Sequence, residues 1–140
     1  MSTPRPTPHD YNEFIGGLNL RSLRLGEAHI KFRRAIDPTR TFEAQHTELA
    51  LYKQKSPGTL VVTHRYEVLI LQPPQKTPAA TIVCSFRLLY ETKKPMTDDI
   101  WSVFSKTSLF LNTWPYMREF VHSALGRMNI PPIIAPTFRS

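Results

Sequence analysis

The alternation of hydrophobic and polar residues predicts a chain rich in β-strands that ends in helices. The clearest strand runs from Leu60 to Leu71, where every second side chain points to the same face. The segment from Ala80 to Glu91 alternates in the same way. Short proline-containing turns, KSPGT and QPPQKTP, precede these two segments. Turns of this length predict antiparallel neighbours.

Two earlier segments predict strands with a less regular alternation. The first spans about Phe14 to Ile36, and its apolar phase shifts part-way along. Either a bulge near Arg21 or a new segment beginning at Gly26 explains that shift. The second spans Phe42 to Gln54 and also changes phase. Because the strands precede the helices, we expect an α+β domain, with a four-stranded antiparallel sheet and a C-terminal helix packed on one face.

Two helices are predicted after the strands. Thr97 is a candidate N-cap, and the two aspartates that follow it suit the first turn of a short helix. Pro115 marks the expected start of a longer helix, since proline has a helical φ and lacks the N–H that a first turn leaves unpaired. Asn112 or Thr113 is the candidate cap of that helix. Apolar residues then recur at intervals of three and four: Trp114, Met117, Val121, Leu125 and Met128.

The two ends of the chain predict irregular segments. Residues 1–13 contain three prolines among small and polar residues, which predicts a flexible arm before a domain at 14–138. Ile130 to Pro136 form an apolar tail with three prolines and no helical period. We expect this tail to be extended and to lie on an apolar surface of its own subunit or of a partner.

Two motifs lie near the C-terminus: WPYMRE opens a helix, and NIPPIIAPTF follows that helix. With this separation, they resemble the SecB family of protein-export chaperones. The resemblance implies an ATP-independent holdase that assembles as a dimer of dimers and keeps nonnative polypeptides in apolar grooves. The client-binding groove it implies draws on aromatic and aliphatic side chains of the C-terminal part: Trp101, Phe104, Trp114, Tyr116, Ile130, Ile133 and Ile134.

The chain departs from the family pattern in two respects. Family members continue into a second C-terminal helix, which we expect to be missing here, because the sequence stops four residues after Pro136. Export SecB proteins are acidic, whereas this chain has a formal charge of +7 and a pI near 9.9. We therefore do not expect it to dock on SecA. A dedicated antitoxin chaperone in a toxin–antitoxin system fits the departures at least as well as a role in export.

The positive charge also supports a different class of function, nucleic-acid binding. Six basic residues could track phosphates, while Phe32, Phe42 or Tyr52 stack on bases. Their spacing matches no named motif. A steep loss of affinity with salt would distinguish this alternative from the binding of apolar clients. The six basic residues are Arg21, Arg24, Lys31, Arg33, Arg34 and Arg40.

Other classes find little support in the sequence. No phosphate loop, nucleophile elbow or pair of histidines at metal-binding spacing is present, so we expect no enzyme, metal or cofactor. No apolar run approaches a membrane span and no signal peptide is recognisable, so we expect a cytoplasmic protein. Cys84 is the single cysteine and suits a buried strand position. Both long strands carry apolar residues on both faces, which predicts a homo-oligomer, a dimer or a tetramer.

Overall fold

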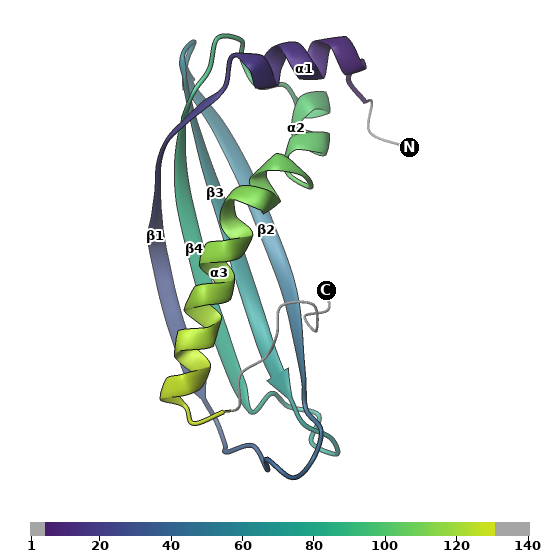
Figure 1. The fold of residues 1–140 in the computed structure, drawn as a ribbon, viewed down its shortest axis with the longest axis vertical. Helices are drawn as coiled ribbons and strands as arrows, with labels where there is room; N and C mark the ends of the chain where they lie inside the picture. The colour runs from purple at the N-terminus through teal and green to yellow at the C-terminus, as the bar shows by residue number, and fades with distance from the viewer. Residues whose placement is uncertain (1–4, 131–140) are drawn as a thin grey trace. The chain divides into compact units, whose positions relative to one another are not determined.

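The structure, a computed structural model, describes residues 5–130. Figure 1 labels the seven elements that lie within these residues. Within the described residues the strands form a four-stranded antiparallel sheet in the order β1-β4-β3-β2, which confirms the predicted α+β class. The elements are α1 (Pro8–Gly16), β1 (Asn19–Phe32), β2 (Glu43–Ser56), β3 (Thr59–Leu71), β4 (Ala80–Glu91), α2 (Asp98–Phe104) and α3 (Ser108–Arg127).

The chain divides into two compact units, and each contains part of every strand. Unit 1 contains α1, α2 and the first turns of α3, and its described residues are 5–24, 50–64 and 86–114. Unit 2 contains the rest of α3, and its described residues are 25–49, 65–85 and 115–130. The two units are described separately below.

The core of unit 1 is built around Phe104, whose side chain is fully buried. Its ring lies edge-on to Phe14 of α1 at 6.3 Å and to Tyr90 of β4 at 5.6 Å between centroids. Such edge-to-face contacts are the arrangement that aromatic quadrupoles favour. On α3, the buried hydroxyl of Thr113 lies 2.9 Å from Nδ1 of the buried His64 on β3. Apolar packing and one buried polar contact therefore hold this unit together.

The core of unit 2 follows the alternation of the two central strands. Tyr66, Val68 and Ile70 of β3 are completely buried, and the residues between them are partly exposed. The second half of α3 contributes the buried side chains Met117, Val121, Ala124 and Leu125. Val121 lies four residues after Met117, and Ala124 and Leu125 lie three and four residues after Val121, so these positions form one stripe along the helix.

The end of α3 explains why the chain leaves the helix where it does. Asn129 has a φ of 57°, in the left-handed region that asparagine tolerates better than most residues. The Ile130 N–H donates to the Leu125 carbonyl at 2.9 Å, and the Asn129 N–H donates to the Gly126 carbonyl at 3.2 Å. This pattern is a Schellman motif. Ile130 is buried as a consequence, with 4% of its surface exposed.

A loop of unit 2, residues 33–42, connects the two edge strands of the sheet. It must cross the ends of β4 and β3, a span of about 14 Å at the usual strand spacing. The side chain of Gln72 holds it in place: its Oε1 accepts from the Asp37 N–H, and its Nε2 donates to the carbonyls of Asp37, Arg40 and Thr41. Gln72 is nearly buried, so the backbone groups around it have little access to water. Its side chain satisfies groups that the crossing would otherwise leave unpaired.

Three sequence predictions differ from the structure. Residues 8–13, which were expected to belong to a flexible arm, instead form the first part of α1. This helix begins at Pro8, where the Thr7 hydroxyl accepts a hydrogen bond from the Asp10 N–H and proline occupies the first turn. Strand β1 begins at Asn19 and runs unbroken to Phe32. The long helix starts at Ser108 rather than at Pro115.

Pro115 lies inside α3, which its sequence position did not suggest. A proline inside a helix removes one hydrogen bond, here the bond to the Leu111 carbonyl. Both Leu111 and Pro115 are exposed, so water can reach that carbonyl. Leu109, near the start of α3, is fully buried. Packing of the apolar residues before the proline, rather than the proline itself, therefore decides where the helix starts.

Candidate functional site

Trp101 lies on α2 in unit 1, where β2 supplies its main aromatic neighbour. The indole is 4.8 Å from the ring of Tyr52 between centroids, and it is partly exposed. The Tyr52 hydroxyl donates to the Asp98 carboxylate in the first turn of α2. Burial, with a further contribution from this hydrogen bond, raises the pKa of Tyr52 to about 12. Tyr52 therefore remains a neutral donor that fixes the start of the helix bearing Trp101.

Phe104 is the second predicted site residue of α2, and its position differs from that of Trp101. The two rings are adjacent, 6.0 Å apart between centroids. Phe104 has no exposed surface, and the rings of Phe14 and Tyr90 pack against it in T-shaped contacts. Its ring can support Trp101 from the core, but it offers no surface to a bound chain in this conformation.

Trp114 lies on α3 and stacks on Phe110, one helical turn earlier. Their centroids are 4.8 Å apart with an angle of 29° between the rings, and both are partly exposed. On the same helix, Asn112 Nδ2 donates to the Tyr90 hydroxyl oxygen at 2.8 Å. Leu111 is 72% exposed. This part of α3 thus combines inward polar anchors with an accessible apolar surface.

The remaining predicted site residues belong to unit 2 or lie outside the described chain. Tyr116 is 51% exposed on α3. Ile130 is buried by the helix-ending motif described above. Ile133 and Ile134, the predicted extended tail and the expected lack of a second C-terminal helix all lie outside residues 5–130.

The edge strands expose apolar residues that sequence reasoning did not assign to a site. On β1, all but one of the residues are exposed. The irregular alternation of these two strands was the available signal, because a strand without one clean apolar face has no single buried side. The exposed apolar residues are Leu20, Leu25, Ile30 and Phe32 on β1, and Leu49 and Leu51 on β2.

The six basic residues that were considered for nucleic-acid binding lie in three different environments. On β1 in unit 1, Arg21 pairs with Glu91, and Arg24 is exposed. Lys31 and Arg33 are exposed at the end of β1 in unit 2. Arg34 and Arg40 are bound to backbone carbonyls of the neighbouring loop, at Thr77 and Pro73.

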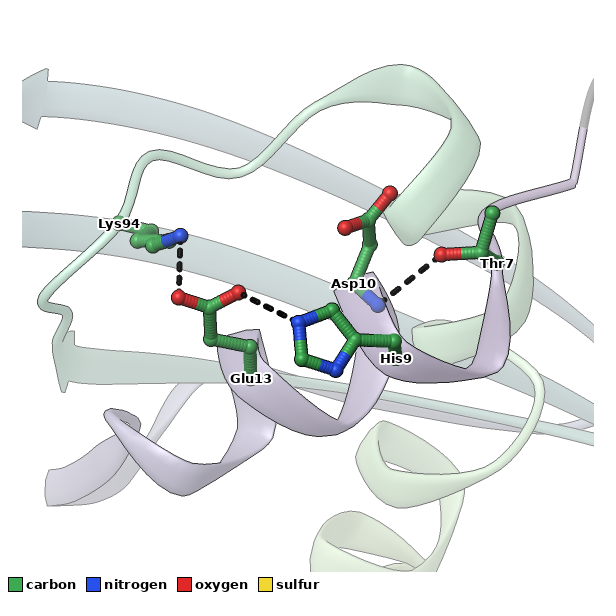
Figure 2. Close-up of polar contacts among 5 residues, drawn as sticks. All are labelled: Thr7, His9, Asp10, Glu13 and Lys94. Carbon is green, nitrogen blue, oxygen red and sulfur yellow. Dashed lines mark hydrogen bonds and ion pairs between the residues drawn. The ribbon is translucent and has the colours of Figure 1, made fainter.

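One group of side chains on α1 has the composition of a metal site. Ligand atoms of His9, Asp10 and Glu13 lie within 4.8 Å of one another, and all three residues are exposed. Figure 2 shows the Lys94 ammonium bound to Glu13, whose other oxygen is 3.6 Å from His9 Nε2. Lys94 holds the pKa of Glu13 below its usual value. A cation here would have to displace the Lys94 ammonium, so these residues fit an ion pair better than a metal.

Asp10, Glu13 and Lys94 also border a hollow of about 300 Å³ in unit 1. It is lined by residues of α1 and of the start of α2, including Phe14, Asp99 and Ile100. The Thr97 hydroxyl donates to Asp99 and lowers the pKa of its carboxyl.

Among residues 5–130, no helix has both the length and the apolar character that crossing a bilayer requires.

The comparisons with known proteins bear on this fold. No protein-family model and no curated protein sequence matches the chain. Solved structures do match it, and the match to one of them shows that the chain has the fold of a SecB-like chaperone. One is Rv1957 of Mycobacterium tuberculosis, a SecB-like chaperone in complex with a ChAD peptide from the Rv1956 HigA1 antitoxin. It aligns with a TM-score of 0.74 and 22% sequence identity, over 85% of this chain and 88% of that chain. The predicted resemblance to SecB is thus confirmed at the level of the fold.

Proposed function

We propose that this protein is a molecular chaperone that binds nonnative polypeptides without ATP. The observation that carries the proposal is the fold, which matches over 85% of the chain a SecB-like chaperone solved with an antitoxin peptide. The partly exposed aromatic side chains on α2 and α3 supply suitable chemistry. They let the same fold hold an extended apolar segment here.

The affinity of such a site comes from removing apolar side chains from water. Each fully buried large apolar side chain contributes about 1.5–3 kcal/mol, with little demand on sequence. Trp101, Trp114 and Tyr116 are the accessible members of the predicted groove, and we retain Ile133 and Ile134 as proposed members. Burial alone drives this kind of binding, so no nucleotide is needed. Several copies in an oligomer would raise the affinity through effective concentration.

We propose that the protein forms a homo-oligomer, either a dimer or a tetramer, and that it acts in the cytoplasm. The second face of the central strands supports this: Val61, Leu69, Leu71 and Leu89 are only partly covered in the single chain. The exposed edge of β1 adds unpaired backbone groups and exposed leucines. Pairing two copies would cover both features, and edge strands rarely remain bare in solution.

We propose an antitoxin as the client to test first, and proteins in export as the second. The positive charge favours this order, because SecA docking in the family uses acidic sheet residues. The neighbouring reading frames in the genome supply a direct check. An adjacent toxin–antitoxin pair supports the first client class, and its absence supports the second.

The test is suppression of aggregation by the purified protein. A chemically denatured enzyme is diluted into buffer without ATP, and light scattering is followed with and without a molar excess of the protein. We expect scattering to fall. Equal scattering in the two samples would refute the proposal.

Tryptophan fluorescence locates the contact. In Trp114→Phe the remaining emission comes from Trp101, and in Trp101→Phe it comes from Trp114. We expect a saturable blue shift in both variants on adding an unfolded peptide, since burial moves an indole out of water. An unchanged spectrum in one variant removes that tryptophan from the proposed site.

A further inference from the structure

Four basic residues gather where two loops of unit 2 meet; we call this cluster the basic platform. Arg33, Arg34 and Arg40 belong to the loop that connects β1 with β2, and Lys76 belongs to the loop that connects β3 with β4. The loops are joined through the Ala79 carbonyl, which accepts from the backbone N–H groups of Arg33 and Arg34 at 2.8 and 3.2 Å. Four cations therefore share one end of the sheet.

Two of the four side chains, Arg34 and Arg40, are held in place by neutral acceptors rather than by acids. Arg34 Nη1 donates to Thr77 Oγ1 at 3.0 Å, and its Nη2 donates to the Thr77 carbonyl. Arg40 donates to the Pro73 carbonyl. These bonds fix the guanidinium groups, and the Gln72 side chain fixes the loop that carries them. Because carbonyls carry no net charge, the positive charge stays available to a partner.

One carboxylate lies in the two loops, and it is hydrogen-bonded within its own turn. Asp37 Oδ1 accepts from the Thr39 N–H at 2.9 Å and from the Thr39 hydroxyl at 2.7 Å. The Thr39 hydrogen bonds, with a smaller contribution from the charge of Arg40, lower the pKa of Asp37. Within residues 5–130, the side chains of Arg33 and Lys76 form no ion pair with a carboxylate. The platform thus keeps most of its charge unbalanced.

We propose that the basic platform binds acidic side chains of the client polypeptide, an inference that rests on the proposed function. Apolar residues lead up to it on β1, where Ile30 is 41% exposed and Phe32 is 50% exposed. Exposed apolar groups followed by fixed cations suit a chain segment in which apolar residues are followed by Asp or Glu. The platform would thereby select clients with acidic flanks, and it would speed their capture through electrostatic attraction.

A single-stranded nucleic acid fits the platform less well. Such ligands stack successive bases on a series of aromatic side chains. The two loops contain one aromatic residue, Phe42, which is partly buried, and on the adjoining end of β1 the exposed rings are Phe32 and the smaller imidazole of His29. Two rings of this kind give no long stacking track. Nucleic acid is accordingly an alternative outcome of the test below.

The test measures binding of three fluorescent probes to the full chain. The first is a neutral peptide with an extended Leu- and Phe-containing segment, the second is the same peptide with a Glu-rich flank, and the third is a single-stranded oligonucleotide. The variant Arg33→Gln/Lys76→Gln removes two platform charges whose side chains make no structural bond among the described residues. The control Lys53→Gln/Lys55→Gln removes two exposed charges of β2 in unit 1.

We expect the acidic flank to tighten binding to the native protein. Exposed ion contacts are individually weak, so the platform variant should lose about three- to tenfold in affinity for the acidic peptide. That variant should bind the neutral peptide normally, and the control should bind both peptides as the native protein does. At about 1 M salt, where the screening length is about 3 Å, the advantage of the acidic peptide should disappear.

Two results would overturn the inference. One is equal binding of both peptides by the native protein, or an advantage that survives in the platform variant. The other is oligonucleotide binding that the platform variant abolishes while the acidic flank has no effect, which would assign the platform to nucleic acids. If the neutral peptide does not bind, that result counts against the proposed function instead. The inference about the platform is then tested by comparing how the native protein and the platform variant bind the acidic peptide.

Discussion

Replacing Phe14 by alanine should detach α1 from unit 1. The Phe14 side chain is 2% exposed and its ring packs edge-on against Phe104. It is the buried residue of a nine-residue helix. An isolated helix of that length is not stable in water, so α1 depends on its contacts with the rest of the unit. Without the ring, we expect residues 8–16 to lose their helical structure.

The structure sets the size of the effect. Phe-to-Ala substitutions in cores cost about 3–5 kcal/mol, including the cavity that remains. The other attachments of α1 are exposed: the Tyr11 hydroxyl lies 3.2 Å from Thr107 Oγ1, and Glu13 pairs with Lys94. Exposed bonds of this kind contribute at most about 1 kcal/mol. Phe14 should therefore outweigh Tyr11 several-fold in the free energy of unfolding.

Urea unfolding measures the difference. Trp101 emission serves as the probe in a Trp114→Phe background, because Trp101 contacts Phe104. Tyr11→Phe is the matched control, since it removes the hydroxyl of a residue on the same helix and keeps the ring. Limited proteolysis should cut Phe14→Ala near residues 8–16 and spare the control. A loss of stability no larger in Phe14→Ala than in Tyr11→Phe would show that this ring does not anchor the helix.

Three further predictions concern single groups. Burial raises the pKa of Cys84 to about 12, so a thiol reagent at pH 8 should label it only after denaturant is added; rapid labelling of the folded protein would contradict the burial. Burial also raises the pKa of Tyr90 to about 12. The folded state then holds that proton more tightly than the unfolded state, and urea unfolding at a series of pH values should show stability falling between about pH 10 and 12; a flat profile opposes it. Pro115→Ala should raise the free energy of unfolding by about 1–3 kcal/mol, as the Leu111 carbonyl regains a partner, and a lower midpoint in denaturant contradicts this.

The sheet could be predicted from the sequence because its central strands have a clear period. Buried and partly exposed residues alternate along β3, as the spacing from Leu60 to Ile70 indicates. The N-cap position of Thr97 and the acidic first turn of α2 were also correctly predicted, although the Thr97 hydroxyl donates to Asp99 and accepts no capping hydrogen bond. In each case the signal is local, so the fold class and most element boundaries follow from short-range rules.

The missed elements depend on tertiary contacts. α1 is held by the burial of Phe14 against Phe104, ninety residues away in sequence, and a proline-rich segment alone does not reveal such a contact. α3 continues through Pro115 because buried residues on both sides fix the helix, which overrides the local preference. Which aromatic residues stay accessible likewise depends on packing, so the sequence could not separate Phe104 from Trp101.

The central claim is that apolar surface of this protein binds polypeptides that have not folded. Calorimetric titration with a permanently unfolded polypeptide, repeated at several temperatures without ATP, tests it most directly. Burial of apolar surface gives a negative heat-capacity change on binding, and for a polypeptide without acidic residues we expect that sign together with an affinity that salt changes little. No binding heat at any temperature, or binding with no heat-capacity change that disappears in salt, would contradict the claim.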